Sequence, residues 1–121
     1  MPTGISAAGA NTALDAIRTD TPFVQLHVGD PGAAGTSNIA TETTRKAVTF
    51  SAASGGSMVN SAQVQWVSIA GSQDATHFSI WNASSAGTFK MSGTITANAY
   101  TAGDTYTAAI GAITLSITPA S

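Results

Sequence analysis

The stretch that decides the fold is residues 106–117, YTAAIGAITLSI, near the carboxyl end of the chain. Its apolar residues alternate with small or polar ones, but they occupy even positions before Gly111 and odd positions after it. A shift of one residue in a strand turns the side chains to the opposite face, so we expect Gly111 to lie at a β-bulge or a sharp corner. The apolar residues are Tyr106, Ala108 and Ile110, then Ile113, Leu115 and Ile117.

The same period of two runs through the chain from Phe23 onward, with turn residues between the apolar runs. The first predicted strand is half-buried, with Val24, Leu26 and Val28 inward and Gln25 and His27 on the other face. Residues 29–32, GDPG, turn the chain, and residues 33–44 are predicted to form a long surface loop. Later strands are marked by Val48 and Phe50, Val64 and Trp66, Phe78 and Ile80, Phe89 and Met91, and by Ile95, Ala97 and Ala99 within a short strand over residues 94–100.

These short runs predict a mainly β fold, a single antiparallel β-sandwich or small barrel of about seven to nine strands. Phe50 and Phe78 are expected in its core. A short amino-terminal helix is predicted from Ala10, Ala13, Leu14 and Ile17 at helical spacing, with Ser6, Asn11 or Thr12 as its cap and Thr21-Pro22 closing it. We therefore expect one domain over residues 1–121, with an arm and helix in residues 1–20 and the sandwich in residues 21–121.

Composition excludes several classes of protein. Only 8% of the 121 residues are charged, against about 25% in a typical soluble domain, and the formal net charge is −2. Four scattered cations give no footprint for nucleic acid or for a membrane surface, and no run is apolar enough to span a bilayer. The start of the chain lacks the pattern of a secretion signal, so we expect a soluble, unprocessed protein. The absence of Cys excludes disulfides and Cys-ligated zinc.

The sequence offers little chemistry for catalysis. His27-x-x-Asp30 and Asp74-x-x-His77 form two imidazole and carboxylate pairs, but turn chemistry already explains aspartates at strand ends, and a metal needs three or four convergent ligands. There is no G-x-S-x-G motif, and Glu42 is the sole glutamate, which disfavours a serine hydrolase and a glycosidase. We expect no enzyme activity, no cofactor and no metal.

Surface contact with other proteins is the better candidate for function. Trp81 lies on the opposite strand face from Phe78 and Ile80, so it is either an interface aromatic or part of a second packed face. Arg45-Lys46 is the single adjacent basic pair in the chain, and it suits either solvent or an acidic partner. The candidate partner-binding residues are Ile5, Glu42, Arg45, Lys46 and Trp81, which include one from the segment before the helix and one from the long loop.

Six short motifs follow one another along the chain: ALDA (13–16), LHVGDPG (26–32), VTFSAASGG (48–56), THFSIWNA (76–83), GTF (87–89) and AGDT (102–105). Their order resembles a family of small virion proteins of tailed bacteriophages, especially those that infect actinobacteria. The resemblance covers nearly the whole chain, although Thr44-Arg45-Lys46-Ala47 departs from it because similar proteins tend to carry an aromatic residue just before the Arg.

This resemblance implies a structural component of the phage particle. We expect a capsid decoration, or cement, protein that forms a homotrimer and binds the major capsid protein on the outer surface of the head. The alternative is a minor tail or tail-fibre-like protein with a receptor- or carbohydrate-binding role. Many identical weak contacts summed by avidity suit the first, and an exposed aromatic cluster around Trp81 would suit the second.

Overall fold

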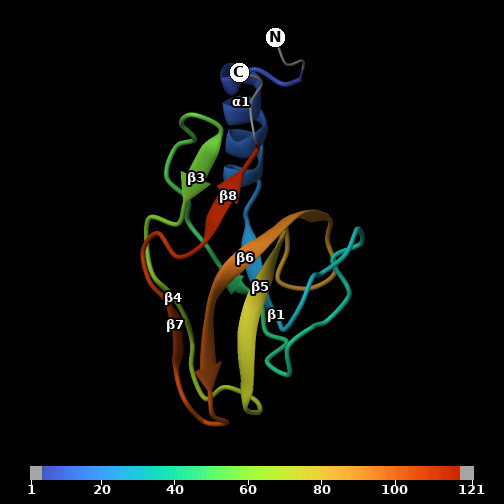
Figure 1. Ribbon diagram of the computed structural model, residues 1–121, viewed down its shortest axis with the longest axis vertical. Coiled ribbons are helices and arrows are strands. Elements are labelled where there is room, and N and C mark those ends of the chain that lie inside the picture. The colour runs from blue at the N-terminus through green and yellow to red at the C-terminus, as the bar shows by residue number, and fades with distance from the viewer. Residues whose placement is uncertain (1–3, 118–121) are drawn as a thin grey trace.

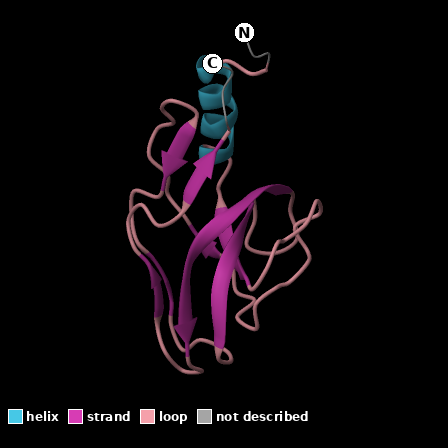
Figure 2. Cartoon of the chain, viewed as in Figure 1, coloured by secondary structure: helices cyan, strands magenta, loops and turns pink. Residues whose placement is uncertain are grey.

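The computed structural model describes residues 4–117, apart from the side chains of Gln73 and of residues 96–100. In this part of the chain one helix and eight strands form, and every strand pairing is antiparallel (Figure 1; Figure 2). The elements are α1 (Ala7–Arg18), β1 (Phe23–His27), β2 (Lys46–Ala47), β3 (Ser57–Val59), β4 (Val64–Trp66), β5 (Gln73–Trp81), β6 (Phe89–Tyr100), β7 (Tyr106–Ala108) and β8 (Thr114–Ser116). The described sheets do not close, so the predicted sandwich forms and the barrel does not.

Two layers of strands enclose the core. The first is the four-stranded sheet with the order β2-β1-β5-β6. The second, which we call the ribbon layer, consists of the two-stranded ribbons β3-β8 and β4-β7. In Figure 1 these ribbons lie to the left of the long β5-β6 hairpin, and α1 stands at the upper end of the molecule beside β3 and β8.

Alternate residues of β1 and β5 fill the space between the layers. Val24 lies opposite Ile80 and Leu26 opposite Phe78 in the strand register, and all four side chains are fully buried. Phe50 is buried in the same cluster, which confirms both predicted core phenylalanines. The ribbon layer contributes Met58, Val64, Trp66, Tyr106, Ala108 and Leu115.

Helix α1 forms as its sequence predicts. Ser6 is its N-cap, and the Ser6 side chain accepts a hydrogen bond from the Gly9 backbone N–H at 3.0 Å. Leu14 and Ala10 are buried under the helix, and the helix ends before Thr21-Pro22, at Arg18.

Two strand predictions need correction. Val48 and Phe50 are buried but lie beyond β2, and Phe50 forms only an isolated bridge with Asn60. The two strands expected around Met91 and over residues 94–100 are one continuous strand, β6. Gly93 lies within this strand. A Cβ there would be 2.7 Å from Phe78 Cζ, so the ring of Phe78 occupies the space that a larger residue would need. The predicted inward positions of Ala97 and Ala99 lie outside the described side chains.

The chain turns a sharp corner at Gly111, as the phase shift predicts. Gly111 has a φ of 85°, and it lies between β7 of one ribbon and β8 of the other. A Cβ there would meet no atom within 4 Å, so the backbone conformation alone favours glycine. Ile110 was expected in the core, but the corner directs it outward and its side chain is 68% exposed.

A buried asparagine that the pattern did not reveal holds this corner. Asn60 Oδ1 accepts hydrogen bonds from the backbone N–H groups of Gly111 and Ile113, at 3.0 and 2.9 Å. Its Nδ2 donates to the carbonyl oxygens of Ala62 and Ala109. The side-chain amide therefore satisfies backbone groups that the turn removes from strand pairing.

Candidate functional site

Three of the residues that the sequence singled out, His27, Arg45 and Trp81, meet on the outer face of the four-stranded sheet. The segment of residues 28–45, which we call the covering loop, folds back over this face. As a result Gln25 and His27 are buried, and β1 is buried on both faces rather than on one. Val28, expected to point inward, is instead 37% exposed. The loop approaches closely at Gly35, where a Cβ would lie 2.5 Å from the Phe89 ring.

A chain of hydrogen bonds runs beneath the covering loop. Trp81 Nε1 donates to Ser79 Oγ at 2.8 Å, and Ser79 Oγ lies 2.7 Å from His27 Nε2. His27 Nδ1 lies 2.8 Å from the Ser37 carbonyl oxygen in the loop. Because a carbonyl only accepts and an indole only donates, the neutral Nδ1–H tautomer of His27 satisfies every atom: Nδ1–H donates to Ser37, and the Ser79 hydroxyl donates to Nε2.

Burial favours that neutral state. Desolvation is the main cause that lowers the pKa of His27, and the charge of His77, its cross-strand partner, acts in the same direction. The hydrogen bond to Ser37 acts in the opposite direction and does not outweigh the two. His27 therefore links the sheet to the covering loop as an uncharged group.

Arg45 closes the end of the covering loop over Trp81. Its guanidinium carbon lies 3.9 Å from the centroid of the indole ring, a cation–π contact. Its Nη1 also donates to the carbonyl oxygens of Ala83 and Ala86, at 3.1 and 2.6 Å, within the turn that joins β5 to β6. Arg45 thus ties the loop, the indole and this turn together.

Trp81 belongs to a packed face and is not an exposed aromatic. Its side chain is only 8% exposed, and its ring centroid lies 5.5 Å from that of Phe89. Of the two predicted roles for Trp81, the structure of the single chain agrees with the second, part of a packed face.

The other candidate residues lie apart from this cluster. Glu42 is buried, and its carboxylate accepts hydrogen bonds from the backbone N–H groups of Thr44 and Ala70. Desolvation acts to raise the pKa of Glu42, but these bonds and the charge of Lys46 outweigh it, so the pKa is lowered. Lys46 is half-exposed on β2, and Ile5 is exposed just before α1. The five candidates therefore do not form one surface.

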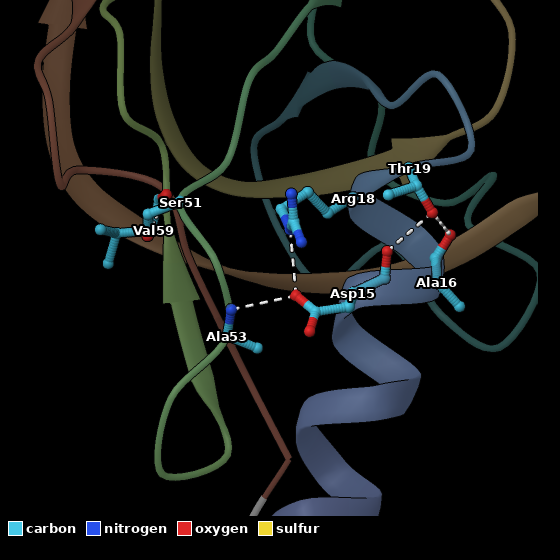
Figure 3. A network of polar contacts seen from close by, with 7 residues as sticks. All are labelled: Asp15, Ala16, Arg18, Thr19, Ser51, Ala53 and Val59. Atoms are coloured by element: carbon cyan, nitrogen blue, oxygen red, sulfur yellow. Dashed lines mark hydrogen bonds and ion pairs between the residues drawn. The ribbon is translucent and has the colours of Figure 1, made fainter.

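A second polar network joins the helix to the strand β3 region (Figure 3). Asp15 Oδ1 accepts hydrogen bonds from the Ala53 backbone N–H and from Arg18 Nε, both at 3.0 Å. These two bonds lower the pKa of Asp15, and the bond from Ala53 has the larger effect. Asn11 Oδ1 accepts from the Gly56 N–H at 2.8 Å. The helix is thus an integral part of the body of the protein rather than a free arm.

The structure also places the residues that the sequence suggested as metal ligands or catalytic groups. Within residues 4–117, no group of three or more His, Asp or Glu side chains is placed to hold a metal ion. Asp30 accepts a hydrogen bond from the Gly32 N–H, as predicted for a turn, whereas Asp74 lies in β5 and not in a turn. Ser79 and His27 are within hydrogen-bond distance, but both residues are fully buried and neither is exposed at the surface.

Sequence reasoning missed Ser79, Gln25 and Asn60. Ser79 shares the odd face of β5 with Trp81, and the alternation of that strand was the one available signal. Gln25 lies opposite Ser79 and accepts a hydrogen bond from Arg45, 20 residues away, so its partner is not visible in the local sequence.

Comparison with known proteins gives the family. A family model described as the podophage GP4 fiber I protein gp80 matches residues 4–116, nearly the whole chain. The chain belongs to this family. It is therefore a structural protein of a phage virion. The resemblance of its motifs implied the same general role. A search of curated proteins found no match. Among the described residues, no helix has the length and apolar character needed to cross a membrane.

Proposed function

We propose that this member of the gp80 fibre family is a structural subunit of a phage tail fibre. The observation that carries the proposal is the family match over residues 4–116, whose description names a fibre protein. The capsid decoration hypothesis, which the motif resemblance favoured, gains no support from that description. The tail-fibre alternative fits it better.

Within a fibre, we infer a structural role rather than a sugar-binding one. Sugar-binding proteins stack the faces of sugar rings on exposed aromatic side chains, whereas no described aromatic side chain of this protein is exposed. Trp81, the residue on which the receptor-binding hypothesis rested, lies under Arg45. This burial supports a subunit that builds the fibre and leaves host recognition to another part of the assembly.

We also propose that the protein is not an enzyme and needs no cofactor. The buried position of the His27–Ser79 pair supports this, since both groups already satisfy each other and the covering loop. Its partners are then further copies of itself, for which a homotrimer remains our prediction, and neighbouring virion proteins rather than nucleic acid or membrane.

The proposal is tested by locating the protein on purified particles of the phage that encodes it. Gold-labelled antibody against the recombinant chain, viewed by electron microscopy, is expected to mark the tail fibres. Label spread over the outer surface of the head would overturn the fibre assignment and restore capsid decoration. Antibody absorbed with the recombinant protein before use serves as the control for specific labelling.

A further inference from the structure

The strands of the ribbon layer and the segments that join them carry no charged residue. The chain has four Lys and Arg residues and six Asp and Glu residues. None of them lies in residues 47–73 or 105–117, the two segments that build the whole ribbon layer. They lie on the helix and its end, the covering loop and β2, strands β5 and β6, and one turn: Asp15, Arg18, Asp20, Asp30, Glu42, Arg45, Lys46, Asp74, Lys90 and Asp104.

The exposed surface of the ribbon layer is therefore built from hydroxyls, amides and apolar groups. On the outward face of ribbon β4-β7, Gln65 lies opposite Thr107 and donates a hydrogen bond to its hydroxyl. Asp104, in the turn before β7, is the charged residue that adjoins this ribbon in the sequence.

The most exposed large apolar residues of the described part of the chain adjoin the same ribbon. Val67 is 59% exposed and Ile110 is 68% exposed. Val67 directly follows β4, whereas Ile110 lies two residues after β7. Because Trp66 pairs with Tyr106 and Val64 with Ala108, the two apolar residues flank opposite ends of the ribbon. Each strand of the ribbon also has one edge with no partner strand among the described elements.

These properties are those of the central part of a protein interface. Charged residues are depleted there, because each charge removed from water must find a partner, while hydroxyls and amides pair with their own kind. Two copies that met through the charged part of the surface would have to pair or desolvate charged side chains of both signs. Two copies that met through the ribbon layer would bury none, because its strands carry no charge and Asp104 lies in the exposed turn at one end of ribbon β4-β7.

We propose that the ribbon layer, centred on ribbon β4-β7 with Val67 and Ile110, is the surface through which copies of this chain pack against one another. A second copy is the occupant because an uncharged, hydroxyl-rich surface is complementary to itself, whereas a charged partner would gain no ion pair from it. The inference goes beyond the proposed fibre function, since it concerns self-association of the chain wherever the protein lies on the particle.

The test compares charged substitutions on the two sides of the fold by sedimentation velocity over a range of protein concentrations. Val67→Lys and Ile110→Lys place a charge in the ribbon layer. Val28→Lys and Ile39→Lys are the matched controls, since these residues are apolar and 37% and 40% exposed but lie on the side of the covering loop. All four positions are at the surface, and circular dichroism checks that each variant remains folded.

We expect the unmodified chain to self-associate, and each ribbon-layer variant to raise the dissociation constant at least about tenfold, as burial of an unpaired charge requires. The two control variants should leave the dissociation constant within about twofold of the unmodified chain. A chain that stays monomeric at all concentrations would overturn the inference, and so would control variants that dissociate as readily as ribbon-layer variants. Association unaffected by all four substitutions would place the interface elsewhere. None of these results changes where the gold label falls, so the fibre assignment is tested separately.

Discussion

The two faces of the four-stranded sheet differ in what covers them. The inner face packs Val24, Leu26, Phe78 and Ile80 into the hydrophobic core that the ribbon layer completes. The outer face is covered by the loop of residues 28–45, through hydrogen bonds to His27 and the stacking of Arg45 on Trp81. The comparison teaches that one sheet combines a core that tolerates no cavity with a polar layer whose stability depends on complete hydrogen bonding.

The largest effect is expected on the inner face. Phe78→Ala should lower the free energy of unfolding by about 3–5 kcal/mol, because it opens a cavity beside Gly93 that the backbone cannot fill. Chemical denaturation measures this change. Val28→Ala, at an exposed position, is the control, with an expected loss below about 0.5 kcal/mol. A loss below about 1 kcal/mol for Phe78→Ala would mean that this face is not the core.

A smaller effect is expected on the outer face. Ser79→Ala should cost about 1–3 kcal/mol, because it leaves His27 Nε2 and Trp81 Nε1–H buried without partners. The matched control is Ser84→Ala in the exposed turn after β5, where we expect little change. Equal denaturation midpoints for Ser79→Ala and Ser84→Ala would show that the hydrogen-bond chain does not hold the loop.

Arg45 gives the next test of the covering loop. Arg45→Ala should cost about 1–2 kcal/mol through the lost indole contact and the two carbonyl bonds. It should also increase hydrogen exchange in the turn of residues 82–88, because that turn loses its anchor. Lys46→Ala is the neighbouring control and should change exchange there very little. Unchanged exchange in Arg45→Ala would contradict the proposed anchoring.

The smallest expected effect is a dependence of stability on pH. Unfolded His27 binds a proton near its ordinary pKa of about 6.5, whereas folding lowers that pKa. Between the two values the unfolded state binds more protons, so the free energy of unfolding should fall as the pH drops below about 6.5. The carboxylates whose pKa is lowered, Asp15 and Glu42, lose their contribution only at more acidic pH.

Melting temperatures of the unmodified chain and of His27→Gln between pH 7.5 and pH 5.5 measure the part of the pH dependence that His27 causes. Glutamine retains a donor for Ser37 and an acceptor for Ser79, so the variant should fold and lose part of the pH dependence. His77→Gln, as the control, should keep most of the contribution of His27, because desolvation is the larger cause of its lowered pKa and the charge of His77 the smaller. An identical slope in His27→Gln and the unmodified chain would mean that His27 is not held neutral.

The sequence predicted the features that local physics determines. Helix α1 follows from its apolar stripe and its Ser6 cap, and the corner at Gly111 follows from a phase shift within twelve residues. The sequence did not predict that His27 is buried, because the covering loop that buries it has no periodic pattern of its own. The hydrogen bond between His27 and Ser79 joins residues 52 positions apart.

The candidate site was predicted less well for the same reason. Arg45 and Trp81 were both singled out, but no contact between them was predicted, because that contact depends on the path of the covering loop. Ile110 fitted the alternation and yet is exposed, because the corner begins one residue before Gly111. Asn60 has no distinctive neighbours in sequence, and its partners at Gly111 and Ile113 lie about 50 residues away, so its role appears only when the corner is built.

Counting the protein in the particle tests the central claim most directly. Quantitative mass spectrometry of purified virions, with isotope-labelled peptides of this chain and of the major capsid protein, gives their molar ratio. A fibre subunit is expected at a small fraction of the major capsid protein, in proportion to the other tail components. A molar ratio close to one copy of this chain per major capsid protein would contradict the fibre assignment and indicate a protein that covers the head.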